Sequence, residues 1–223
     1  MVVIIAECGV NWRNLAEADL MIRDCADAGA DICKFQAYED YQVASHPRDK
    51  ELFDIRLKEE DIRYLYWRCC QHKIEFMCTP MYDDAVIILD PYVKRWKIRE
   101  KDNHNWGLVG DCLDTHKEIL LSSQELLTIP SPLKRIKQLY CIPEYPPKKG
   151  HDIVNNYKGF AGASCHYPVI DIALDFVKLG AEYLEVHVKR DYYPPGDYCP
   201  VDNAVSITIS ELRELVNRIR EQE

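Results

Sequence analysis

Hydrophobic residues in this chain occur in short runs, separated by longer stretches in which apolar side chains recur every three or four positions. The short runs are typical of buried β-strands, and the longer stretches are typical of helices that cover a core with one face. Eight runs are predicted to be strands, over residues 2–6, 31–36, 74–78, 93–98, 118–122, 137–141, 159–164 and 182–188. Helical spacing fills most of the intervals, over residues 13–28, 58–72, 82–89, 104–114, 151–158, 169–179 and 208–221.

Regular alternation of strands and helices predicts an α/β fold, in which right-handed βαβ units build a parallel sheet. Eight such units predict that the sheet closes into a compact (β/α)8 TIM barrel, with chemistry at the carboxyl ends of the strands. One unit is shorter than the others, because the segment SQELLTIPSPLKRI (123–136) contains two prolines that leave little room for a helix. We therefore expect a shortened crossover after the fifth strand.

Alternation of side chains within a strand assigns each residue to the barrel interior or to the outer layer. In EYLEVHV (182–188) the leucine and the valines form an apolar set that faces the helices, so Glu185 and His187 point inward. The same parity in DICKFQ (31–36) turns Lys34 and Gln36 inward. Ionisable residues therefore gather where the predicted strands end, at Glu7, Lys34, Lys97, His166 and His187.

Composition narrows the class of protein. With 223 residues, 47% of them hydrophobic, the chain can form one large core, and we expect a single domain over residues 1–223. The net charge of -9 and the lack of a Lys/Arg-rich run argue against a nucleic-acid partner. No basic leader precedes the first strand, and no apolar run is long enough to span a membrane. We expect a cytoplasmic protein that binds a small molecule.

Ten cysteines raise the question of disulfides or a metal cluster. Most of them lie within predicted strands or on helical patterns, and no pair has the C-x-x-C spacing of zinc and redox motifs. A free thiol in such a position packs as a small hydrophobic group. We therefore expect free buried thiols rather than a zinc cluster.

Short motifs at the predicted strand ends resemble those of one enzyme family. In chain order they are IIAECGVN, GADICKFQ, IEFMCTP, KI at Lys97, ILLSS, YCIPEYPPK, GASCH and GAEYLEVHVKRD. This ordered set resembles the catalytic barrel of the sialic acid (N-acetylneuraminate) synthases. The resemblance implies a transferase that condenses phosphoenolpyruvate with an amino-sugar aldehyde, forms a carbon–carbon bond and releases phosphate.

The resemblance also implies roles for individual residues. His166 and His187 match histidines that hold a divalent metal, Mn²⁺ or Mg²⁺, and Lys34 and Lys97 match lysines that bind the carboxylate and phosphate of phosphoenolpyruvate. Other positions that match the family's site are Glu7, Gln36, Asp102, Ser122, Tyr145, Ser164, Glu185 and Asp197.

The proton-transfer group is not fixed by the sequence. Glu7, Asp102 and Asp197 each supply a carboxylate that could accept or deliver the proton of the reaction. All three stay open as alternatives.

Two departures from the family pattern fall near the expected phosphate site. Glu100 stands in KIREK where the family usually has a phosphate-binding serine, and Pro143, which has no N–H to donate, replaces a polar residue. If the fourth strand continues, Arg99 shares the inward face with Lys97 and restores positive charge, helped by Lys101, while Glu100 points outward. Alternatively, REKD is only a solvated charged turn.

The sequence therefore predicts a phosphoenolpyruvate-dependent synthase related to the sialic acid synthases, with an altered sugar acceptor. We expect the family's C-terminal antifreeze-like domain to be absent, because the sequence ends at Glu223. A homodimer stays open. So do two other functions: a sugar- or metal-binding barrel that has lost its phosphate site, and a different metal-assisted aldolase.

Overall fold

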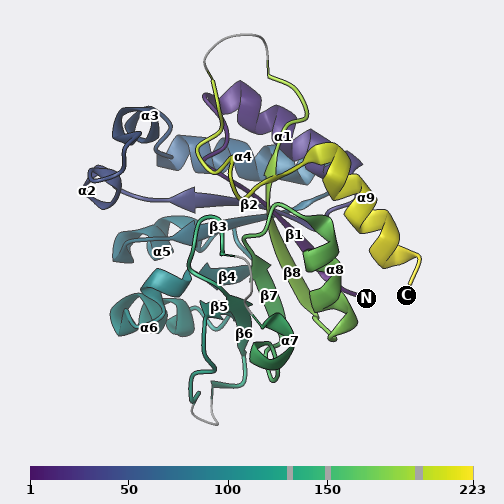
Figure 1. Ribbon diagram of the computed structural model, residues 1–223. Helices are drawn as coiled ribbons and strands as arrows, with labels where there is room; N and C mark the ends of the chain where they lie inside the picture. The colour runs from purple at the N-terminus through teal and green to yellow at the C-terminus, as the bar shows by residue number, and fades with distance from the viewer. Residues whose placement is uncertain (130–132, 149–151, 194–197, 223) are drawn as a thin grey trace.

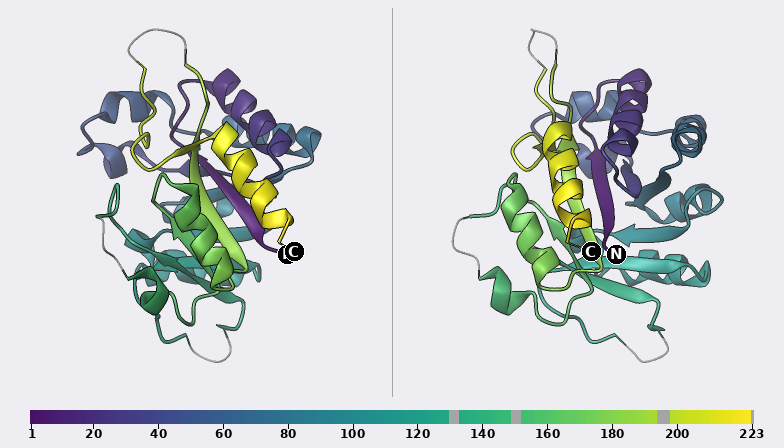
Figure 2. Two further views of the ribbon diagram at one scale, coloured as in Figure 1. Left: turned by 45° about the vertical axis from the view of Figure 1, so that its right-hand side comes forward. Right: turned by 90° about the vertical axis from the view of Figure 1, so that its right-hand side faces the viewer.

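The computed structural model describes residues 1–129, 133–148, 152–193 and 198–222, and in this part strands alternate with helices (Figures 1 and 2). The main strands are β1 Val3–Gly9, β2 Ile32–Ala37, β3 Glu75–Pro80, β4 Arg95–Ile98, β5 Glu118–Ser123, β6 Ile136–Cys141, β7 Gly162–Cys165 and β8 Tyr183–Lys189. The helices are α1 Leu15–Asp27, α2 Asp40–Val43, α3 Asp49–Asp54, α4 Glu59–His72, α5 Asp83–Leu89, α6 Trp106–Asp114, α7 Ile153–Asn156, α8 Ile170–Lys178 and α9 Ile209–Arg220. A short 3-10 helix, η1, spans Glu100–Asp102, and a two-residue strand, β9, spans Ile207–Thr208.

The eight main strands form a nearly closed ring. They follow the order β3-β2-β1-β8-β7-β6-β5-β4, every paired neighbour is parallel, and the short β9 pairs with the end of β8 outside this order. The two end strands, β3 and β4, lie side by side, but within the described residues no hydrogen-bonded ladder joins them. The predicted α/β barrel is thus confirmed as a TIM-barrel-like ring with one unpaired seam.

Hydrophobic residues form two layers, one on each side of the sheet. The outer layer lies between the strands and the helices, and it contains Phe35 and Val186, as the parity of the strands predicts. The inner layer fills the amino-terminal half of the barrel with Ile5, Ile32, Met77, Leu120, Leu139 and Tyr183. Because side chains two residues further along a strand share its face, the polar residues that follow this inner layer point toward the carboxyl-terminal mouth.

Every predicted helix is present, with small differences at the ends. Between β5 and β6 the described residues of 124–135 contain no α-helix, as expected for the shortened crossover. Helices α2 and α3, which lie between β2 and α4, were not predicted. The Tyr38 hydroxyl donates a 2.8 Å hydrogen bond to the Leu52 carbonyl and holds this segment in place. None of the described helices has the length and apolar character that spanning a bilayer requires.

Candidate active site

The carboxyl ends of the strands surround a cavity of about 290 Å³. Most of the residues predicted for the site line it, namely Glu7, Lys34, Gln36, Lys97, Arg99, Ser122, Tyr145, Ser164, His166, Glu185 and His187. Asp102 is not part of the lining, because its carboxylate pairs with the Arg99 guanidinium outside the cavity wall. Asp197 lies outside the described residues. Thr79 and Cys141 also line the cavity, although the sequence analysis did not single them out.

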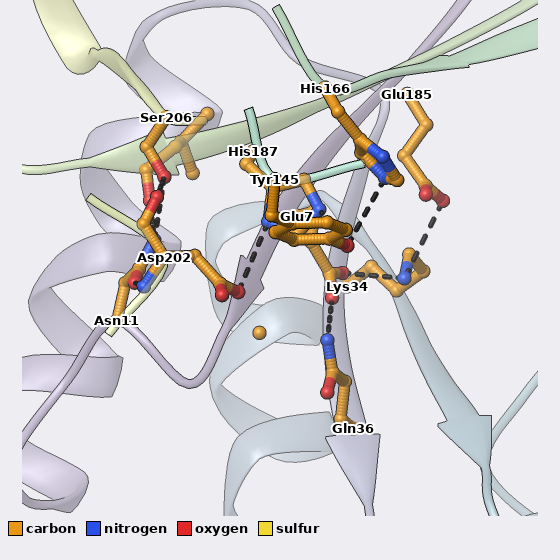
Figure 3. A network of polar contacts seen from close by, with 12 residues as sticks. Glu7, Asn11, Lys34, Gln36, Tyr145, His166, Glu185, His187, Asp202 and Ser206 are labelled. Carbon is orange, nitrogen blue, oxygen red and sulfur yellow. Dashed lines mark hydrogen bonds and ion pairs between the residues drawn. The ribbon is translucent and has the colours of Figure 1, made fainter. Parts of the chain in front are cut away.

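Two carboxylates and two lysines form a buried network on the cavity floor, and Figure 3 shows Glu7, Lys34 and Glu185 of this network. Strand register brings them together, since Glu7 of β1 is paired with Lys34 of β2. The Lys34 Nζ lies 2.6 Å from Glu7 Oε2 and 3.5 Å from Glu185 Oε2. Lys97 Nζ lies 3.4 Å from Glu185 Oε1, which also accepts a 2.7 Å hydrogen bond from the Ser164 hydroxyl. Each charge in the network thus has a partner of opposite sign.

The two carboxylates of this network differ in their affinity for a proton. Burial acts to raise the pKa of Glu185, but Lys34 and Lys97 outweigh it and lower that pKa to about 2. For Glu7 burial prevails over the attraction of Lys34, so its pKa is raised above the usual value. Neighbouring acids whose pKa values are driven apart are suited to different roles. Glu185 stays ionised, whereas Glu7 can carry a proton.

The two lysines also differ. For Lys34, the attraction of Glu185 and Glu7 overcomes burial and raises its pKa above the usual value, so the ammonium keeps its charge. For Lys97, burial outweighs Glu185 and lowers the pKa. An additional anion in the cavity would therefore stabilise the charged form of Lys97.

The histidines lie at the ends of β7 and β8, where their rings meet edge to face with centroids 5.2 Å apart, and both contact the Tyr145 hydroxyl (Figure 3). The Tyr145 oxygen is 3.2 Å from His166 Nε2 and 3.4 Å from His187 Nε2. On the far side of the rings, His166 Nδ1 is 2.9 Å from the Ile142 carbonyl oxygen, and His187 Nδ1 is 3.3 Å from Asp202 Oδ2. A carbonyl and a carboxylate only accept hydrogen bonds, so both Nδ1 atoms carry hydrogen toward them.

This arrangement fits a divalent metal ion. With Nδ1 directed at an acceptor, Nε2 of each ring points into the cavity at the Tyr145 hydroxyl, where a neutral ring offers its lone pair to a metal. Burial lowers the pKa of His166 to about 3, so this ring is neutral, whereas Asp202 outweighs burial and raises the pKa of His187, which must lose its Nε2 proton to bind an ion. A histidine that binds a metal usually donates its second ring N–H to a carbonyl or carboxylate, which fixes the ring orientation. His166 and His187 both have such a partner.

Asp202 is a site residue that the sequence analysis missed. It precedes β9, and the side chain of Asn11 fixes its position: the Asn11 Oδ1 accepts a 2.8 Å hydrogen bond from the Asp202 N–H. The Asn11 side chain also donates a 2.9 Å hydrogen bond to the Ser206 hydroxyl, which in turn donates to the Asp202 carbonyl. No pattern within the segment PVDNAVS signals this role, because the contact with His187 joins residues fifteen positions apart through the fold.

The expected phosphate side of the cavity departs from the prediction. Strand β4 ends at Ile98, so strand parity does not extend to Arg99, whose guanidinium pairs with Asp102. Because the strand does not continue, the condition under which Glu100 was expected to point outward is not met, and Glu100 lines the cavity together with Arg99 and Lys101. The buried Ser122 hydroxyl also lines the cavity and has no hydrogen-bond partner within the described residues, so it is available to a ligand.

Comparison with known proteins identifies relatives of the whole chain. A family model described as the NeuB family matches residues 21–223. The N,N'-diacetyllegionaminic acid synthase of Campylobacter jejuni is 27% identical over 257 residues, an alignment that covers 98% of this chain and 75% of that protein. The crystal structure of the N-acetylneuraminic acid synthetase from Leptospira borgpetersenii, in complex with citrate, superposes with a TM-score of 0.83 at 26% identity and covers 99% of this chain and 84% of that chain.

More distant structures share the fold alone. A truncated 3-deoxy-D-arabino-heptulosonate 7-phosphate synthase from Thermotoga maritima has a TM-score of 0.74 at 16% identity, over 99% of this chain and 86% of that chain.

Proposed function

The chain belongs to the NeuB family, and from this membership we propose that it condenses phosphoenolpyruvate with an aldehyde sugar, forming a carbon–carbon bond and releasing phosphate. Its relatives include nonulosonic acid synthases. One observation carries the proposal furthest: a single cavity presents two converging histidine nitrogens on one side and two buried lysines on the other.

The histidine side would receive the sugar aldehyde. A Mn²⁺ or Mg²⁺ ion held by the Nε2 atoms of His166 and His187 would act as a Lewis acid on the aldehyde oxygen. Asp202 would keep the His187 ring in place through Nδ1. The Tyr145 hydroxyl, which lies between the two rings, would give way to the ion or to the aldehyde oxygen.

The lysine side would bind phosphoenolpyruvate, which carries about three negative charges. Lys34 and Lys97 are each only 3% exposed, and charges attract more strongly in such a site than in water. The Ser122 hydroxyl is free to donate to an oxygen of the substrate. Lys101 adds positive charge at the rim of the cavity, and Arg99 is a further candidate if it leaves Asp102.

The proton balance of the reaction points to Glu7. When C3 of phosphoenolpyruvate attacks the aldehyde carbon, the aldehyde oxygen gains a proton; when water attacks C2, the water loses one, and phosphate then leaves with cleavage of its C–O bond. One group can carry the proton between these sites. Glu7 has a raised pKa and lies in the cavity, whereas Asp102 lies outside it. We therefore favour Glu7 as the group that carries the proton. Asp102 would act only through its ion pair with Arg99, and the role of Asp197 stays an untested prediction.

The test is phosphate release from phosphoenolpyruvate with Mn²⁺ and a panel of aldehyde sugars that includes N-acetylmannosamine, with the product identified by mass spectrometry. We expect release to require both the sugar and the metal. Lys97→Ala should reduce kcat/KM at least a hundredfold, whereas the exposed Lys178→Ala should not change it. Arg99→Ala, assayed beside Lys97→Ala, decides whether Arg99 contacts the phosphate.

Glu100 and Pro143 in the cavity wall favour a second candidate, a barrel that binds a sugar or metal without phosphoenolpyruvate. Calorimetric titration with phosphoenolpyruvate separates the two functions. Binding without turnover would leave the acceptor unidentified among the sugars tested. No binding, together with no phosphate release, would reject the synthase proposal in favour of the non-catalytic barrel.

A further inference from the structure

Three cysteine side chains meet on the outer side of the sheet, behind the floor of the cavity. Cys8 of β1, Cys25 of α1 and Cys33 of β2 are fully buried. Their sulfur atoms all lie within 4.8 Å of one another. Cys8 Sγ is 3.8 Å from Cys25 Sγ and 3.3 Å from Cys33 Sγ. Among the residues that the structure describes, no other group of three or more His, Cys, Asp or Glu side chains brings its ligand atoms this close together.

Local structure explains why these three thiols converge. Cys8 and Cys33 belong to neighbouring paired strands, and their parity is opposite to that of Glu7 and Lys34, so both sulfurs face the helices. Cys25 lies on the buried face of α1, which covers these strands. The cluster is therefore built into the βαβ unit formed by β1, α1 and β2.

The spacing of the sulfurs matches that of ligands around one metal ion. A metal–sulfur bond of about 2.3 Å places the sulfurs of a three- or four-coordinate site roughly 3.8 to 4.0 Å apart. Cys8 Sγ lies at 3.3 Å and 3.8 Å from the other two sulfurs, and no two of the three are more than 4.8 Å apart, so all three can reach one ion after small shifts. Side-chain rotations alone can therefore complete the site.

We propose that Cys8, Cys25 and Cys33 form a trigonal binding site for a soft monovalent cation of the Cu(I) class. The site offers sulfur donors only, and thiolates select soft ions such as Cu(I) and zinc over magnesium or manganese. Structural zinc needs four ligands; the three sulfurs are too deeply buried for water to supply a fourth, and Cys69, a further buried thiol near Cys33, lies outside the group. The proposal does not depend on the proposed synthase activity.

Charge balance favours a monovalent ion in this position. The cluster lies in the apolar layer between the strands and the helices, where net charge is costly. Cysteine binds a metal as the thiolate, and one Cu(I) balances the charge of one thiolate, whereas a divalent ion needs two. Any proton displaced from a thiol on binding passes to solvent.

The nearby thiol of Cys69 distinguishes the Cu(I) site from a zinc site. Cys69 of α4 interacts with the Cys33 thiol but lies outside the group of three. A trigonal Cu(I) site does not need Cys69, whereas a tetrahedral zinc site would recruit it as the fourth ligand.

The experiment uses the full chain with its two exposed cysteines, Cys70 and Cys199, changed to serine. Cu(I) is supplied without oxygen in the presence of bicinchoninate as a competing chelator, and the copper retained after desalting is measured per chain. We expect one equivalent in this background. Cys25→Ala should lower the affinity at least a hundredfold, whereas Cys112→Ala, which changes a buried thiol in α6, should retain the ion.

X-ray absorption at the copper edge of the unsubstituted cluster tests the site without relying on variants that could fail to fold. Three sulfur ligands at about 2.3 Å would support the proposal. Nitrogen or oxygen ligands, or no retained copper, would overturn it. Stronger retention of Zn(II) than of Cu(I), lost on Cys69→Ala, would replace the Cu(I) assignment with a zinc site.

Discussion

At the residue scale, the neighbours of His166 and His187 determine which ring nitrogens face the cavity. Both Nδ1 atoms are directed at acceptors, so changing either histidine to alanine should abolish Mn²⁺ binding, measured by calorimetry. Asp202→Asn should weaken binding by about 10- to 100-fold, the usual effect of losing a partner that orients a ligand. The exposed His104 provides the control, since His104→Ala should bind normally. Unchanged binding in both histidine variants would remove the metal assignment.

Glu100 adds negative charge to the side of the cavity where we expect phosphate. Glu100→Ser should therefore strengthen phosphoenolpyruvate binding by about tenfold, which corresponds to about 1.4 kcal/mol of relieved repulsion. Equilibrium titration measures the change, with Glu59→Ser on the exposed face of α4 as the matched control. Weaker binding in Glu100→Ser would show that this carboxylate supports the substrate instead of repelling it.

Strand parity is the reason why much of the candidate site could be predicted from sequence. It placed Lys34, Gln36 and His187 on the inward face, and the structure shows them in the cavity wall. The alternation of side chains holds only within a strand, and β4 ends at Ile98, so it could not predict the position of Glu100. It also says nothing of Asp202, whose position depends on a hydrogen bond to Asn11 far away in the sequence.

At the element scale, hydrophobic periodicity located the eight strands and the longer helices, because each of them buries a regular apolar face. Helices α2 and α3 lack such a face: none of the residues of α2 is buried, and α3 buries only Leu52. They depend on contacts with other segments, such as the hydrogen bond from the Gln42 side chain to the Met81 carbonyl. Such contacts leave no local pattern in the sequence.

Pairing of β7 with β8 depends on a glycine. A Cβ at Gly162 would lie 2.3 Å from the Tyr183 carbonyl oxygen, a backbone atom that cannot easily move. Gly162→Ala should therefore lower the free energy of unfolding by about 3 kcal/mol, measured with urea. Gly110→Ala in α6 is the control, because a Cβ there meets no atom within 4 Å and should stabilise the helix by up to about 1 kcal/mol. Equal effects of the two variants would contradict this account of the β7–β8 contact.

At the scale of the whole molecule, the buried ion network links stability to pH. The folded pKa of Glu185 is about 2, below its ordinary value of 4.5. Between these values the unfolded chain binds more protons, so the contribution of Glu185 is complete above pH 4.5 and is lost as the pH falls toward 2. Glu185→Gln should destabilise the protein by about 3 to 5 kcal/mol at pH 7, because two buried lysines lose their partner.

The difference in unfolding free energy between the wild type and Glu185→Gln should narrow at pH 3, because at this pH unfolded wild-type chains take up a proton at Glu185 that the folded protein, with a pKa of about 2, does not bind. Urea unfolding at both pH values measures the difference. Glu60→Gln, on the exposed surface of α4, should show no comparable narrowing. The same difference at pH 3 as at pH 7 would rule out Glu185 as a strongly ionised member of the network.

The unpaired seam between β3 and β4 makes the barrel a split ring. In a fully closed barrel, strand number and stagger fix the circumference, whereas a split ring can widen or narrow at its opening. The opening lies diametrically opposite the junction of β7 and β8, which carries both histidines. Lys97 is on β4, at the lip of the opening. We therefore expect the lysine side of the cavity to adjust its width to a substrate more readily than the histidine side, whose two strands are joined by a hydrogen-bonded ladder.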